Sequence, residues 1–146
     1  MLYTLKWITI IVLCVLTCSF VSWKVADSKL EVFQGEHSDG FEVLTWKEKT
    51  YHQYVLLGGV SDLVGEKFAK VETEGRKSEA IFKIKGGYPV EQWVIHLDTN
   101  MMGCYTLYKE DGVTDIPAEF EELLAAYERE IQEAHEREEQ AAQDPS

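Results

Sequence analysis

An uncharged segment near the amino terminus restricts the fold of this chain more than any other feature. Residues 7–23 read WITIIVLCVLTCSFVSW and lie between two lysines. As a helix this stretch would reach about 25 Å, and its neighbours would extend it toward the ~30 Å hydrocarbon layer of a bilayer. Trp7 and Trp23 stand where aromatic belts form at the two membrane interfaces. The segment therefore predicts one N-terminal transmembrane helix, a signal anchor over residues 1–26.

Two alternatives to an uncleaved anchor stay open at this point. A secretory signal is cut after small residues, and Thr17-Cys18-Ser19 offers such a place, although the apolar run continues beyond it. A lipid attached to Cys18 is the other alternative, although the preceding Thr17 is not the small residue that bacterial lipoprotein signals favour. Lys6 lies before the segment and no acidic residue does, so we expect a cytoplasmic amino terminus and an extracytoplasmic body.

The remainder of the chain is strongly acidic. The net charge of the whole chain is −12, of which residues 116–146 carry −8. Because a surface of this sign repels phosphate backbones and anionic lipid headgroups, we expect no nucleic-acid partner and no polybasic membrane contact. Cys104 is the only cysteine after the apolar segment, so the body must fold by burial rather than through an internal disulfide.

The centre of the chain has the residue pattern of β-strands. Residues 27–40 are mixed polar and read as a linker, in which Phe33 is a candidate start for a first strand. From Phe41 onward, β-branched and aromatic residues alternate with polar ones. The predicted strands are Phe41–Trp46, Thr50–Leu57, Lys67–Thr73, Ala80–Lys85, a strand with Trp93, Ile95 and Leu97, and Cys104–Lys109. They predict a β domain over residues 41–115, a small antiparallel meander curled into a barrel or sandwich.

Several stretches of this domain resemble one group of known proteins. FEVLTWKEKTY, VGEKFAKV and IFKIKG are followed by WVIHL and YTLYKED. Residues 41–111 thereby resemble uncharacterised small extracytoplasmic proteins of Gram-positive bacteria, which are membrane-anchored or lipoprotein-like. Ala69 and Lys70 depart from the group's pattern, where a glycine-containing step is expected. The resemblance implies a location and a small β fold, and it implies no particular activity.

The carboxyl-terminal segment predicts a different element. Residues 116–146 contain Pro117 at the start and glutamates in the first turn, as a helix N-terminus favours. Apolar residues recur at spacings of three and four and form one face for packing on the sheet or on a partner: Phe120, Leu123, Leu124, Tyr127 and Ile131. Beyond Ala134 this face ends, and we expect a solvated, fraying helix end. The mainly β body with this helix belongs to the α+β class.

The histidines and acidic residues show no spacing typical of a metal or catalytic site. His96 and Asp98 share one face of a predicted strand, and His37 lies two residues from Asp39. Because a metal site needs three or four converging ligands, we interpret these residues as surface or packing residues and expect no metal, cofactor or catalytic group.

Six aromatic residues allow two interpretations. They are Trp46, Tyr51, Tyr54, Trp93, Tyr105 and Tyr108. The first interpretation is core and cross-strand packing. The second is an aromatic-lined groove that binds a peptide, a glycan or another protein.

These patterns favour a membrane-tethered, extracytoplasmic binding or structural module with a protein or peptide partner at the cell envelope. One alternative is a small secreted hydrolase-like enzyme that uses His96, Asp98, His52 and glutamates. Another is an immunity-type protein that captures a basic partner through its acidic face. The sequence leaves the oligomeric state open.

Overall fold

The computed structural model describes residues 8–17, 29–38, 41–59, 61–99 and 102–143. The chain divides into two compact units, residues 1–31 and residues 32–146. In the first unit, residues 8–17 form a helix whose side chains are all exposed. None of the helices within the described ranges combines the length and the apolar character that crossing a bilayer requires. The other residues of the predicted anchor, 1–7 and 18–26, lie outside the described ranges.

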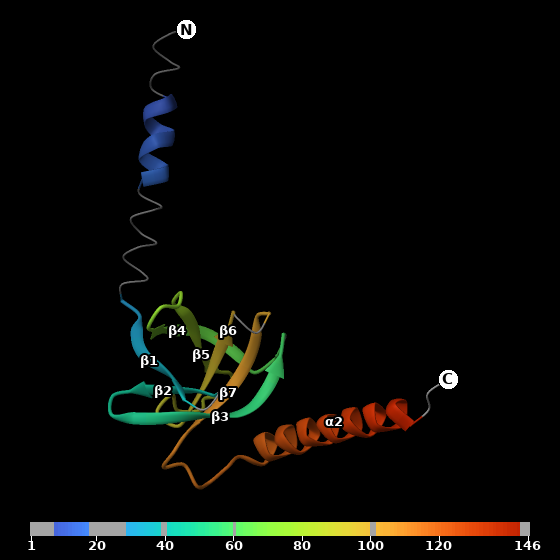
Figure 1. Cartoon of the computed structure of the whole chain (residues 1–146). Coiled ribbons are helices and arrows are strands. Elements are labelled where there is room, and N and C mark those ends of the chain that lie inside the picture. The colour runs from blue at the N-terminus through green and yellow to red at the C-terminus, as the bar shows by residue number, and fades with distance from the viewer. Residues whose placement is uncertain (1–7, 18–28, 39–40, 60, 100–101, 144–146) are drawn as a thin grey trace. The chain divides into compact units, whose positions relative to one another are not determined.

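The second unit is built around seven strands (Figure 1). Their bounds are β1 Glu31–Ser38, β2 Phe41–Trp46, β3 Lys49–Gly58, β4 Val64–Thr73, β5 Glu79–Ile84, β6 Trp93–Asp98 and β7 Cys104–Glu110. They form a closed barrel in the order β1-β2-β3-β7-β6-β5-β4, and β4 returns to β1. The predicted mainly β fold with a C-terminal helix is confirmed, and the barrel is the form that it takes.

Two details of the predicted topology were wrong. Residues 31–38 were assigned to a linker with a candidate strand start at Phe33, and in the structure all of them form β1, which pairs with β2 so that Gln34 lies opposite Thr45. The strands also do not follow one continuous meander, because β3 pairs with β7 rather than with β4. Closure explains the first difference, since without β1 the edges of β2 and β4 would have no partner.

The turn between β2 and β3 is tight and is made by ordinary residues. Lys47 and Glu48 both have positive φ angles, 48° and 64°. A two-residue turn of this kind matches the twist of the flanking strands, which is why hairpins prefer it even though glycine and asparagine fit it better. The Lys47 ammonium lies 4.3 Å from the centre of the Trp46 ring, a cation–π contact at the same turn.

The strands bury side chains on both faces of the barrel wall. Those pointing inward form the barrel interior: Phe33, Leu44, Trp46, Tyr51, Ala69, Val71, Ile81, Val94 and Tyr108. A second cluster has at its centre Val55, Ile84, Trp93, Ile95, Leu107 and Phe120. Because the second cluster includes Phe120 of the C-terminal helix, that helix covers part of the outer wall. β6 supplies residues to both clusters, and its residues 93–96 are all buried.

The C-terminal helix α2 spans Ala118–Gln143. Its first hydrogen bonds run from the backbone N–H groups of Phe120 and Glu121 to the carbonyl of Pro117, so the helix begins two residues after its predicted start. Phe120 is fully buried, with its ring 4.7 Å from those of both Trp93 and Tyr88. From residue 128 to residue 142 every side chain is exposed. The predicted solvated part is therefore exposed as expected, but it stays helical to Gln143.

Candidate functional site

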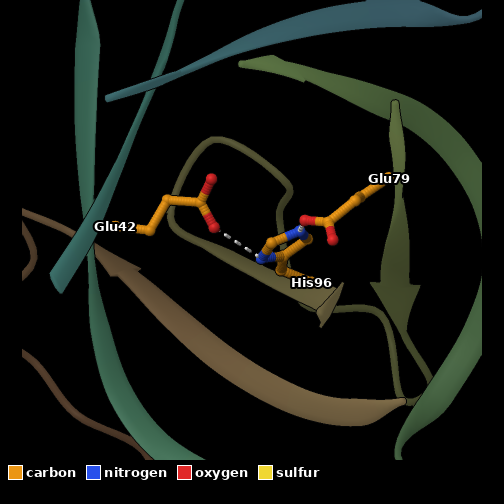
Figure 2. A group of neighbouring side chains, drawn as sticks. All are labelled: Glu42, Glu79 and His96. Atoms are coloured by element: carbon orange, nitrogen blue, oxygen red, sulfur yellow. Dashed lines mark hydrogen bonds and ion pairs between the residues drawn. The ribbon is translucent and has the colours of Figure 1, made fainter. Parts of the chain in front are cut away.

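The interior of the barrel contains a cluster of two carboxylates and one imidazole. Glu42 lies on β2, Glu79 on β5 and His96 on β6, and all three side chains point toward one another (Figure 2). Each is almost completely buried, with side-chain exposures of 5%, 4% and 1%. One candidate ligand atom from each residue lies within 4.8 Å of the others. We refer to these three residues as the Glu–His–Glu cluster.

Strand alternation explains why these polar residues point inward. On β2 the buried residues are Glu42, Leu44 and Trp46, at every second position. On β6 the inward residues Val94 and His96 alternate with the outward residues Trp93 and Ile95. The sequence pattern predicted this alternation correctly. It did not reveal that the face of β6 opposite the apolar one is the interior of a closed barrel.

Glu79 holds the imidazole ring of His96 from one side. The two residues are joined by a 2.7 Å hydrogen bond between His96 Nε2 and Glu79 Oε2. The other oxygen of Glu79 accepts hydrogen bonds from the backbone N–H and the hydroxyl of Thr99, at 3.0 and 2.8 Å. An ionised carboxylate can only accept, so His96 Nε2 is the donor of the shared bond. The Glu79 carboxylate is thus fixed at both oxygens.

The second ring nitrogen of His96 has no hydrogen-bond partner. His96 Nδ1 is buried and lies 3.6 Å from Glu42 Oε2, in a geometry that makes no hydrogen bond. The other oxygen of Glu42 accepts a 3.1 Å hydrogen bond from the Thr73 hydroxyl. A buried, unpaired ring nitrogen beside a carboxylate is uncommon, because leaving such a group unsatisfied costs about 1–3 kcal/mol.

Tyr108 forms one wall of the cluster. Its ring centre lies 5.8 Å from that of His96, in an edge-on arrangement. Burial raises the pKa of the Tyr108 hydroxyl well above its usual range, and the negative charges of Glu42, Asp98 and Glu79 raise it further. The interior therefore favours neutral or positively charged groups at this end of the barrel.

The six aromatic residues do not gather on one surface. Trp46, Tyr51 and Tyr108 belong to the barrel interior, whereas Trp93 is buried in the second cluster, with Tyr54 and Tyr105 partly buried against it. They lie on opposite sides of the barrel wall, so they do not line one groove. Their role in the described structure is packing, for example the edge-on contact of Tyr54 with Trp93 at 5.3 Å.

The predicted partner-helix face is covered in a graded way. Phe120 is buried, Leu123, Leu124 and Tyr127 are half-buried against the barrel, and Ile131 is exposed. A groove of about 460 Å³ runs between this helix and β3, with Val55 on its barrel side and Tyr127 on its helix side. The first half of the face therefore packs on the barrel, and its distal end does not.

The other proposed catalytic residues lie apart from the Glu–His–Glu cluster. His52 is exposed on β3 and pairs with Asp111 at 3.2 Å. Asp98 ends β6 and is half-buried. His37 is an exposed residue of β1, and Asp39 lies outside the described residues. His96 was interpreted as a surface or packing residue, and the structure places it in the interior, beside Glu42 and Glu79.

Sequence reasoning did not single out Glu42 and Glu79. The three residues of the cluster are far apart along the chain, and only barrel closure brings β2 opposite β5 and β6. A signal was present for Glu42, which alternates with Leu44 and Trp46 in the predicted strand Phe41–Trp46. Glu79 stands just before the predicted strand Ala80–Lys85 and becomes its first residue only in the structure. Comparisons with models of protein families, with curated proteins and with solved structures find no match to this chain.

Proposed function

We propose that this chain is a binding module held at the outer face of a cell membrane, where its acidic helix binds a basic protein or peptide. One observation carries the proposal: α2 keeps its helical form far beyond the part that packs on the barrel, and its side chains from residue 128 to residue 142 are exposed. The helix contains nine glutamates and two arginines, a net charge of −7. Such a rod attracts positively charged surfaces.

The charge of the exposed part is only weakly compensated from within. Arg137 is held by Glu133, through a 3.1 Å hydrogen bond to its carbonyl and a 3.7 Å ion pair with its carboxylate. The buried ring of Phe120 fixes the other end of the helix to the barrel. A fixed base and an exposed acidic end present the glutamates in a defined arrangement, which lowers the entropic cost of binding.

One face of the exposed part combines charge with an apolar contact. Ile131 is 39% exposed, and around it Glu128, Glu136 and Glu139 line the same hollow. A partner that places an apolar side chain on Ile131 and lysines or arginines on the glutamates would complement this face. This charge pattern supports a basic partner over a neutral one.

The helix in the first unit supports the membrane tether. Its large apolar side chains are more than half exposed: Ile8, Ile10, Ile11, Val12, Leu13, Val15 and Leu16. The Thr17 hydroxyl donates to the carbonyls of Leu13 and Cys14, so this polar group is satisfied within the helix. An apolar surface of this kind is stable against lipid. The charge bias around the segment and the resemblance to Gram-positive extracytoplasmic proteins support an outward-facing body.

Binding of a lysine-rich peptide to the full-length chain in detergent micelles tests the proposal. We expect a saturable interaction that weakens by at least tenfold when sodium chloride rises from roughly 50 to 300 mM, because salt screens exposed charges. The triple variant Glu128→Gln, Glu136→Gln and Glu139→Gln should weaken binding at low salt. A peptide affinity that changes neither with salt nor with these substitutions would disprove the proposed partner chemistry.

A matched control removes the same charge from the barrel. Glu36, Glu74 and Glu91 are exposed residues outside α2. Their combined substitution to glutamine changes the net charge by the same amount as the helix variant and should leave peptide affinity close to that of the native chain. An equal loss in both triple variants would show that overall charge, rather than α2, drives the interaction.

The orientation has its own experiment. We expect a protease added to whole cells to remove an epitope tag placed after the carboxyl terminus, while a cytoplasmic marker protein stays intact. Protection of the tag in cells that remain sealed would contradict an outward-facing body.

A further inference from the structure

We propose that Glu42 and His96 bind a divalent transition metal ion of the zinc class inside the barrel, with Glu79 holding the histidine ring in place. The observation behind it is the buried His96 Nδ1, which has no hydrogen-bond partner and faces Glu42 Oε2 at 3.6 Å (Figure 2). The metal site is independent of the proposed partner of α2, because the two involve different residues.

The hydrogen bond to Glu79 prepares His96 as a ligand. Because His96 Nε2 donates to Glu79 Oε2, the neutral ring carries its lone pair on Nδ1, toward Glu42. Histidine ligands of metals usually donate their other ring nitrogen to a carboxylate in this way, which fixes the ring and strengthens its donor atom. Glu79 is held in turn by two hydrogen bonds from Thr99, which fix its orientation toward His96.

The spacing of the donor atoms suits a tetrahedral ion. Two ligands about 2.0–2.1 Å from zinc lie about 3.4 Å apart at a tetrahedral angle. The separation between His96 Nδ1 and Glu42 Oε2 is 3.6 Å, close to this value and too long for a hydrogen bond. Water molecules would occupy the remaining coordination positions, since two protein ligands leave the ion open.

The chemistry of the donors selects the class of metal. An imidazole nitrogen favours zinc, iron, copper and nickel, whereas calcium and magnesium prefer sites made of oxygen alone. Charge points in the same direction. The Glu42 carboxylate is buried beside His96, and a divalent cation between the two would offset its negative charge.

The cluster is closely packed around Glu42. A side chain on Gly35 would come within 2.9 Å of Glu42 Oε1 and would overlap the Thr73 hydroxyl that binds it. The absence of a side chain at Gly35 therefore leaves room for the Glu42 carboxylate and for its hydrogen bond to Thr73. This bond fixes one oxygen of Glu42 and leaves the other oriented toward His96.

Calorimetric titration of the full-length, chelator-treated chain with zinc chloride tests the site. We expect one zinc ion per chain at neutral pH. His96→Gln removes the Nδ1 atom that would bind zinc but keeps an amide that can donate a hydrogen bond to Glu79. This variant and Glu42→Gln should each weaken zinc binding at least 100-fold. Glu79→Gln should weaken it by about 10–100-fold, as loss of a supporting group does.

Exposed histidines provide the controls. His52→Gln and His135→Gln remove imidazoles that lie on the surface and should leave the affinity unchanged. Absence of saturable zinc binding would overturn the proposal, as would a site lost with His52 or His135 but kept in the His96 and Glu42 variants.

A second measurement uses the native chain and so does not depend on a variant that folds. X-ray absorption of the zinc-loaded protein should show a shell of nitrogen and oxygen with the scattering of a single imidazole. Ligation by two or more imidazoles, or by sulfur, would disprove the assignment.

Discussion

Gly35 on β1 and Thr73 on β4 face each other across the closure of the barrel, so closely that a side chain on Gly35 would overlap the threonine hydroxyl. That hydroxyl donates to Glu42 Oε1. One glycine thus links the closing pair of strands to the Glu–His–Glu cluster.

Gly35→Ala should therefore destabilise the fold. The added methyl group must displace Thr73 or Glu42, and overpacking of this kind costs about 1–3 kcal/mol. Urea unfolding followed by circular dichroism would measure the loss. Gly59→Ala is the control, because a Cβ there would have nothing within 4 Å. Equal stability of the two variants would show that the contact around Gly35 relaxes freely.

Glu48→Gly should stabilise the chain. Glu48 has a φ angle of 64°, in the left-handed region that strains every residue with a side chain. Glycine accepts this geometry, and after its larger loss of chain entropy we expect a gain of about 0.5–1 kcal/mol in the free energy of unfolding. Glu74→Gly, in a turn where residue 74 has no positive φ, should instead lower stability. Thermal unfolding of both variants would measure the two changes in stability, and changes of the same sign would contradict this expectation.

Phe120→Ala should release α2 from the barrel. The ring is fully buried against Trp93 and Tyr88, and truncation of such a residue costs about 3–5 kcal/mol. Hydrogen exchange along the helix should then accelerate from residue 118 onward. Ile131→Ala, at an exposed position of the same helix, should change neither exchange nor global stability. A helix that keeps its protection in the Phe120 variant would show that other contacts hold it.

Tyr51→Phe should change how stability depends on alkaline pH. Burial raises the pKa of the Tyr51 hydroxyl above its usual value, and the charges of Glu110 and Glu91 raise it further. Tyrosines of the unfolded chain ionise near pH 10, whereas Tyr51 in the folded chain ionises at a higher pH. Between these two pH values the unfolded chain binds fewer protons than the folded chain, so stability falls as pH rises.

The stabilising contribution of this pKa shift is complete below pH 10. Above that pH the native chain should lose about 1.4 kcal/mol per pH unit more than Tyr51→Phe does. At neutral pH the variant loses the 3.1 Å hydrogen bond to the Val90 carbonyl, worth about 0.5–1.5 kcal/mol. Unfolding curves of both proteins at several pH values between 9 and 12 provide the measurement. The same dependence of stability on pH in both would contradict the raised pKa of Tyr51.

Local pattern was sufficient for most strands. The prediction of Phe41–Trp46 matches β2, and the prediction of Cys104–Lys109 differs from β7 by one residue. Alternation of side chains is a local property of an extended chain, and it is readable without knowing the neighbours. β1 was predicted only as a candidate strand start at Phe33, because its sequence, EVFQGEHS, is mostly polar and because barrel closure rather than its own composition makes it a strand.

The sequence by itself determined an apolar leading segment, an alternating β body and an acidic amphipathic helix, because each of these depends on residues that are close along the chain. Only the tertiary structure decided that the polar side of β6 faces a closed interior, that Glu42 and Glu79 meet His96 there, and that the six aromatic residues divide between two sides of one wall. The physical reason is strand pairing over long distances: the partner of a strand and the sheet face that becomes the interior are set by closure, which no local window contains.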